Sequence, residues 1–185
     1  MAESVGKVYG TAFFQLCEEE NCLEKAYNEL GEVIKLLYEG NDDDVSEYVK
    51  FLSSPLISAD EKVQSLKSVL ESQLSALTLD FLCLVTEKGR FRYMSEIFGE
   101  FKQMYNDKMN ILEVTAVTAE PLSGRLRDKL KTKLESVTGK TVLLSEKVDK
   151  SLIGGIVIRY GNAQIDSSVK TRLDKLKAQI NGVIA

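Results

Sequence analysis

Apolar residues in the first half of the chain recur with the 3.6-residue period of an α-helix. Residues 5–17 form one apolar helix face, made by Val5, Val8, Tyr9, Ala12, Phe13, Leu16 and Cys17, with Phe14 off its centre. The same period continues in the segments 23–38, 45–52, 58–70, 74–87 and 91–105. The pattern predicts six helices joined by short loops, which is an all-α bundle over residues 1–108.

Short polar motifs mark the predicted helix ends. Ser58 and Glu61 form an S-x-x-E capping box, which predicts a helix start. Gly89 and the Gly40–Asn41 pair predict helix ends, because glycine and asparagine adopt the left-handed backbone conformation easily. The acidic run Asp42–Asp44 lacks the D-x-[DN]-x-[DN]-G pattern of a calcium loop. It therefore favours helix capping over a metal site.

The period changes at Asn110, where strand-like segments begin. Residues 111–117 and 141–148 have the composition of β-strands, and residues 122–137 between them are predicted as a helix. Its apolar face is Leu122, Leu126, Leu130, Leu134 and Val137. A third strand, a short fourth and a final helix follow. The predicted fold class is α+β, with a six-helix bundle (1–108) followed by a small α/β domain (109–185).

The second domain is organised around residues 151–175. Gly154 and Gly155 open its third strand, where a glycine pair indicates a bulge or the close approach of another backbone. Gly161–Asn162 predicts a turn. Residues 166–168 offer side-chain oxygens that can cap the final helix. None of these residues is an evident catalyst.

The composition narrows the possible chemistry. The 185 residues include no histidine, which removes the commonest general base and transition-metal ligand. Cys17, Cys22 and Cys83 are an odd number in helical segments, so we expect buried, inert thiols in a reducing compartment. Gly139–Thr141 is no phosphate loop, because Leu134 stands where that motif needs glycine. An enzyme is disfavoured, and neither a cofactor nor a metal ion is expected.

Charge is divided unevenly along the chain, whose net charge is −4. Residues 1–108 contain 11 Lys and Arg against 20 Asp and Glu, a net charge of −9, and residues 109–185 contain 13 against 8, a net charge of +5. The split fits two domains with different partners, and equally two solvated surfaces. The alternative hypothesis is a nucleic-acid-binding protein with a basic second domain. Against it, the basic residues of the predicted helix 122–137 flank its leucine face and do not form a single row. These residues are Arg125, Arg127, Lys129, Lys131 and Lys133.

No membrane-targeting segment is expected. No basic segment precedes an apolar stretch near Met1, and no apolar run approaches the roughly 20 residues that span a bilayer. Membrane association is therefore expected only through a partner.

Three motifs, in order along nearly the whole chain, carry a family resemblance. The first is Val8–Tyr9–x–x–Ala12 with Phe13 or Phe14, with Gly10 where alanine is usual. The second is the turn Lys88–Gly89–Arg90, with lysine where asparagine is usual. The third is the stretch 151–169, with its glycine pair, strand and Asp166–x–Ser168. Together they resemble the delta subunit family of bacterial F-type ATP synthase, related to the mitochondrial oligomycin-sensitivity-conferring subunit.

The resemblance implies a non-catalytic stator subunit of a proton- or sodium-translocating ATP synthase. Its helical domain would bind the N-terminal segments of the α subunits in the catalytic head. Its second domain would hold subunit b, which forms the peripheral stalk, so that the head resists rotary torque. The implied location is peripheral, on the cytoplasmic face of the bacterial cell membrane.

The resemblance also suggests contact residues. In this family an amphipathic helix lies in a groove between the first and fifth helices, which points to Tyr9, Ala12 and Leu84. Tyr9 and Ala12 could equally be core residues. In the second domain Gly154, Gly155 and Arg159 are candidates for stalk contact, although a bulge there needs glycine whether or not a partner docks.

Overall fold

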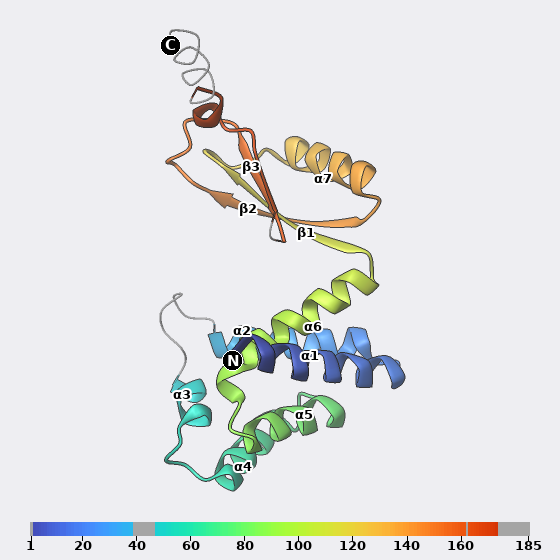
Figure 1. The fold of residues 1–185 in the computed structure, drawn as a ribbon, viewed down its shortest axis with the longest axis vertical. Coiled ribbons are helices and arrows are strands. Elements are labelled where there is room, and N and C mark those ends of the chain that lie inside the picture. Colours follow the sequence, from blue (N-terminus) through green and yellow to red (C-terminus); the bar gives the residue numbers. More distant parts are fainter. Residues whose placement is uncertain (1, 39–46, 162, 174–185) are drawn as a thin grey trace. The chain divides into compact units, whose positions relative to one another are not determined.

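The computed structural model describes residues 2–38, 47–161 and 163–173. The chain divides into two compact units, Met1–Tyr105 and Asn106–Ala185. The first unit is helical, and the second is built on a small sheet that carries a helix (Figure 1). Each unit has its own set of buried apolar residues.

Helices make up the described part of the first unit. They are α1 (Ala2–Glu19), α2 (Leu23–Tyr38), α3 (Glu47–Ser53), α4 (Ala59–Leu70), α5 (Ala76–Glu87), the 3-10 turn η1 (Phe91–Tyr93) and α6 (Met94–Lys108), whose last three residues belong to the second unit. Among the described residues, no helix is both long and apolar enough to cross a membrane.

Two predicted helix ends are confirmed. At the start of α4 the Ser58 amide donates to Glu61 Oε2 at 3.2 Å, and the Glu61 amide donates to Ser58 Oγ at 3.3 Å. After α5, Gly89 has φ of +64°. The predicted stop at Gly40–Asn41 and the acidic run Asp42–Asp44 lie outside the described residues.

Aromatic side chains from three helices meet at the centre of the first unit. Phe13 of α1 stacks on Phe81 of α5 with ring centroids 4.0 Å apart, and lies 5.4 Å from the ring of Phe101 in α6. Phe14, expected off the centre of the apolar face, is also buried, and its ring meets Phe101 edge-on. By contrast Val8 and Leu16, expected inward, are 63% and 41% exposed. The apolar face of α1 is therefore only partly covered by the core, and Val8 and Leu16 lie on its uncovered part.

A buried carboxylate ties α2 to the start of α5. Glu29 is only 9% exposed. Its Oε1 accepts from the Ser75 amide at 3.0 Å, and its Oε2 accepts from Ser75 Oγ at 2.6 Å. Ser75 directly precedes α5, so the glutamate satisfies a donor at a helix start that has no partner within the helix.

The second unit has a mixed four-stranded sheet in the described residues. Its elements are β1 (Ile111–Thr118), α7 (Gly124–Thr138), β2 (Thr141–Val148), β3 (Ile156–Tyr160) and β4 (Ala163–Asp166), in the order β2-β1-β3-β4. β1 and β2 are parallel, as expected for strands joined through a helix, and the other two pairs are antiparallel. Residues 169–173 begin a further helix.

Only one face of the sheet carries α7. Glu146 of β2 bonds Arg127 of α7, so the side chains of Val142, Leu144 and Glu146 lie on the helix side. The cover is thin, because α7 has no fully buried residue and its Leu126 is 55% exposed. The predicted leucine face of this helix is therefore only partly buried.

The α+β class predicted from the sequence is confirmed. The count of six helices in the bundle stays a prediction, since residues 39–46 are not described and η1 adds a short turn. Gly10, which stands where alanine is usual in the family motif, is buried against α6.

Gly10 gives a stability prediction opposite to helix propensity. A Cβ there would lie 2.8 Å from the Ile97 carbonyl oxygen and 2.8 Å from Glu100 Cβ. We expect Gly10→Ala to destabilise the protein by about 1–3 kcal/mol, although alanine is the better helix former by about 1 kcal/mol. Urea unfolding measures the change.

Gly99→Ala in α6 is the matched control. Gly99 is exposed, and nothing lies within 4 Å of the position that a Cβ would take there. We expect this substitution to gain about 0.5–1 kcal/mol of stability. Stabilisation by both substitutions would contradict the close approach of α1 and α6.

Candidate partner-binding groove

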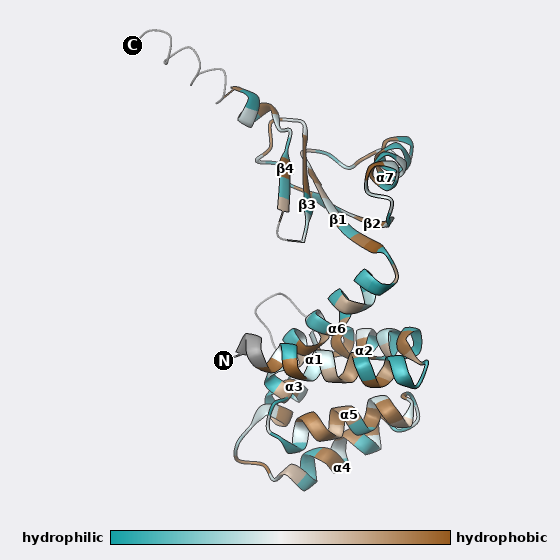
Figure 2. Ribbon diagram, turned by 45° about the vertical axis from the view of Figure 1, so that its right-hand side comes forward, coloured by the Kyte–Doolittle hydropathy of each residue, from teal (hydrophilic) through white to brown (hydrophobic). Residues whose placement is uncertain are grey.

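An apolar groove of about 200 Å³ lies between α1 and α5. Phe13 and Phe81, both buried, form its floor, and the remaining lining is Val8, Tyr9, Ala12, Leu16 and Leu84. Leu84 is 44% exposed, and Ala12 is also exposed. Figure 2 shows α5 as hydrophobic along most of its length, so this helix supplies both core and groove. A surface of this kind can accept an apolar helix face.

The structure places the three first-unit candidates together. Tyr9, Ala12 and Leu84 all line this one groove. The sequence pattern missed Val8 and Leu16 as groove residues because an apolar helix position does not reveal whether another helix covers it. It also missed the two phenylalanines of the floor.

Arg90 borders the groove at Tyr9. Its guanidinium lies 5.1 Å from the centre of the Tyr9 ring, and its Nη1 donates to the Tyr9 hydroxyl at 3.0 Å. The turn Lys88–Gly89–Arg90 sets this position: Gly89 is left-handed, and the Arg90 amide donates to the Val85 carbonyl at 2.9 Å. A cation over an aromatic ring contributes about 0.5–1 kcal/mol at an exposed site. The contact fixes the Tyr9 ring that lines the groove.

Gly155 in the second unit is required by the fold. Its φ is +86°, and a Cβ would lie 2.6 Å from the Ser167 carbonyl oxygen. Two backbone bonds hold that approach, from the Ser167 amide to the Ile156 carbonyl and from the Val169 amide to the Gly154 carbonyl, both at 3.0 Å. The pair therefore marks the close approach of another backbone segment. Gly154 is less constrained, because its Cβ would meet only Val169 Cγ2 at 3.4 Å.

Arg159 lies on the sheet face opposite α7. Thr115 Oγ1 and Ser145 Oγ are 2.9 Å apart, so both side chains point away from the Glu146 side. Arg159 pairs with Thr115 across β1 and β3, which puts it on the same face. It is exposed, and its Nε donates to Gln164 Oε1 at 3.1 Å. Arg159 is thus available to a partner on this face.

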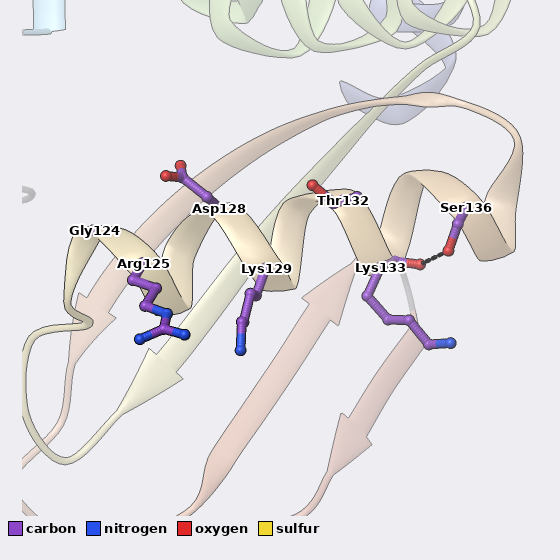
Figure 3. A pocket seen from close by; sticks show the side chains of 7 residues that line it. All are labelled: Gly124, Arg125, Asp128, Lys129, Thr132, Lys133 and Ser136. Carbon is purple, nitrogen blue, oxygen red and sulfur yellow. Dashed lines mark hydrogen bonds between the residues drawn. The ribbon is translucent and has the colours of Figure 1, made fainter.

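The basic residues of α7 form two groups. Arg127 bonds Glu146, and this hydrogen bond lowers the pKa of the carboxyl group. Lys131 Nζ lies 4.0 Å from Glu135 Oε1. The second group extends to solvent along a shallow hollow of about 750 Å³ and consists of Arg125, Lys129 and Lys133 (Figure 3). The hollow is also lined by Gly124, Asp128, Thr132 and Ser136. One helix alone lines this hollow, so it does not enclose a ligand. In the described ranges 2–38, 47–161 and 163–173, no group of three or more Cys, Asp or Glu side chains is placed so that it could hold a metal ion.

The glycine pair gives a stability prediction. We expect Gly155→Ala to destabilise the second unit by about 1–3 kcal/mol, because alanine at positive φ is strained and its Cβ meets backbone. Gly154→Ala is the matched control and should change stability by less than about 1 kcal/mol. Thermal unfolding followed by circular dichroism distinguishes them, and equal losses from both would contradict the assigned close approach.

Comparison with known proteins identifies the family. The family model of the ATP synthase delta (OSCP) subunit matches residues 5–180. The ATP synthase subunit delta of Clostridioides difficile is 34% identical over 185 residues, 100% of both chains. That of Alkaliphilus oremlandii is 30% identical over 184 residues, 100% of this chain and 99% of the relative.

A solved structure agrees. A chain in the cryo-EM structure of the Toxoplasma gondii mitochondrial ATP synthase hexamer is similar with a TM-score of 0.73 and 28% identity, over 95% of this chain and 96% of that chain. The resemblance found in the sequence motifs is confirmed, and the nucleic-acid alternative gains no support. This chain belongs to the ATP synthase delta (OSCP) subunit family and is a non-catalytic stator subunit of F-type ATP synthase.

Proposed function

We propose that the groove between α1 and α5 binds the N-terminal segment of an α subunit of the catalytic head. The host is a six-helix bundle within residues 1–108. The observation that carries the proposal is the groove itself, where Val8, Leu16 and Leu84 are exposed beside a buried aromatic floor. Covering such side chains is favourable by about 25 cal/mol per Å² of apolar area.

The dimensions and shape of the groove suit one helix. Its α1 lining runs from Val8 to Leu16, which is about 12 Å at 1.5 Å per residue. Slightly more than two turns of a guest helix, at about 5.4 Å per turn, cover that distance. Ala12 stands in the middle with the smallest side chain of the exposed lining, so a guest backbone can approach closely there.

The second unit, within residues 109–185, is proposed to hold the end of subunit b in the peripheral stalk. Several large apolar side chains are exposed in its described part: Leu126, Val137, Leu143, Val148, Ile153, Ile165, Val169 and Leu173. Exposed apolar surface of this extent suits a protein partner. Exposed Arg159 offers a charged contact on the face away from α7, and Gly154 and Gly155 support that region of backbone.

Holding both partners at once gives the mechanical role. The head is prevented from turning with the rotor because one chain joins it to the stalk, so rotation stays coupled to ATP synthesis or hydrolysis. The proposed location is the cytoplasmic face of the bacterial cell membrane, reached through the complex.

Ala12→Lys tests the head-binding site. Isothermal titration of the full chain with a peptide of the α-subunit N-terminal segment from the same organism should give a single site. Micromolar binding corresponds to about 8 kcal/mol. We expect Ala12→Lys to weaken it at least tenfold, about 1.4 kcal/mol, because a charged side chain is placed in the apolar groove.

Gln15→Lys is the control for that experiment. Gln15 is exposed on α1 outside the groove lining, and the substitution makes the same charge change. It should bind like the wild type. Wild-type affinity in Ala12→Lys, or equal loss in both variants, would contradict the proposed groove.

Arg159→Glu tests the stalk contact. We expect the full chain with this substitution to bind a fragment of the end of subunit b several-fold more weakly, since a cation on the contact face becomes an anion. Arg125→Glu on α7 is the matched control and should retain binding. Loss in Arg125→Glu with none in Arg159→Glu would place the stalk on the other side of the sheet.

A further inference from the structure

The end of α1 brings two cysteines together. The Cys22 amide donates to the Cys17 carbonyl at 2.9 Å, and the Asn21 amide donates to the Glu18 carbonyl at 3.2 Å. Asn21 has φ of +54°. These are the two backbone bonds of a Schellman motif, in which the residue three before the cap and the residue two after it commonly contact each other. In this chain both of those residues are cysteines.

The helix-end geometry brings the two side chains side by side. Cys17 is fully buried, and the Schellman motif places Cys22 next to it. Burial, the neighbouring Cys22 and the Glu29 carboxylate raise the pKa of the Cys17 thiol to about 12. Cys17 is thus a poor first target for an oxidant, because the thiolate is the reactive form.

Cys22 differs from Cys17 in its access to solvent. It is partly exposed and borders a surface hollow of about 430 Å³ lined also by Asn21, Glu24, Lys25 and Asn28. This corrects the expectation that all three cysteines are buried. Cys83, in α5, is buried, and burial is also the main cause of its raised pKa. The chain therefore places one partly exposed thiol, Cys22, beside one buried thiol, Cys17.

We propose that Cys17 and Cys22 form a redox-active dithiol that closes to a disulfide under mild oxidation by hydrogen peroxide. The Cys22 thiolate attacks one peroxide oxygen, which breaks the O–O bond, releases hydroxide and leaves a sulfenic acid. The Cys17 sulfur then attacks the sulfenic sulfur, forming the S–S bond. The thiol proton and the sulfenic hydroxyl leave as water, so two thiols and one peroxide give one disulfide and two waters.

The bond would link the last turn of α1 to the residue that precedes α2. Cys17 follows Leu16 of the groove directly, so oxidation would fix the end of the helix that lines the groove. The proposal rests on the helix-end geometry and does not depend on what occupies the groove.

Peptide mapping of the full chain tests the proposal. The protein is treated with peroxide, unfolded, alkylated with iodoacetamide and digested with trypsin, which yields residues 8–25 with both cysteines on one peptide. We expect this peptide unalkylated and about 2 Da lighter than its reduced form, the mass of the two hydrogens lost. Dithiothreitol should restore both thiols, and Cys83 should stay alkylatable throughout.

A second digest and two variants complete the test. A protease that cleaves after glutamate cuts at Glu18, Glu19 or Glu20, between the two cysteines. In the oxidised protein the two fragments should therefore remain joined by the disulfide until it is reduced. Cys83→Ser should behave like the wild type. Cys17→Ser should lose the disulfide and carry Cys22 on to the sulfinic acid, about 32 Da heavier.

Three results would overturn the proposal. They are alkylation of both cysteines after peroxide treatment, Cys22 sulfinic acid in the wild type at the rate seen in Cys17→Ser, and a disulfide-linked dimer through Cys22. The first and the third are read from the wild-type protein alone, so they stand even if Cys17→Ser folds poorly.

Discussion

The stack of Phe13 on Phe81 is the contact on which the first unit depends. It joins α1 to α5 at a ring separation of 4.0 Å, and Phe101 extends the cluster to α6. Each such aromatic pair contributes about 0.5–1.5 kcal/mol beyond the area that it buries. The same two rings form the groove floor. The core and the proposed binding surface are therefore opposite sides of one contact, and α1 cannot separate from α5 without losing both.

The second unit is held together differently. Its sheet carries α7 on one face, and that helix buries no residue completely. Its closest packing is between two backbone segments. Because Gly155 has no side chain, the backbone of Ser167 and Ser168 can approach it. Ser168 is 2% exposed and its amide donates to Asp166 Oδ1 at 2.8 Å, so this corner is closely packed while much apolar surface stays open. Such a unit suits a subunit whose remaining apolar area is covered by a partner.

The sequence predicts local features well and distant contacts poorly. The Ser58–Glu61 box and the Gly89 stop are determined by neighbouring residues, so their motifs predict them. Glu29 bonds Ser75, 46 positions away, and nothing in the helical period distinguishes it from a solvated glutamate. Gly10 looks like a weak helix position until α6 is seen against it. The groove shows the same limit. Tyr9, Ala12 and Leu84 could be predicted as groove residues from the family resemblance, whereas the exposure of Val8 and Leu16 could be known only from the packing of the helices.

Methyl NMR of the full chain during titration with the α-subunit N-terminal peptide would locate the head-binding site. We expect shifts concentrated on Val8, Leu16 and Leu84, whose methyl groups line the groove from two helices. Leu36 and Leu56 are also exposed in the first unit but lie outside the groove, so their signals should stay in place. Shifts at Leu126 and Val137 of α7 with none at Val8 or Leu84 would contradict the account and move the head-binding site to the second unit.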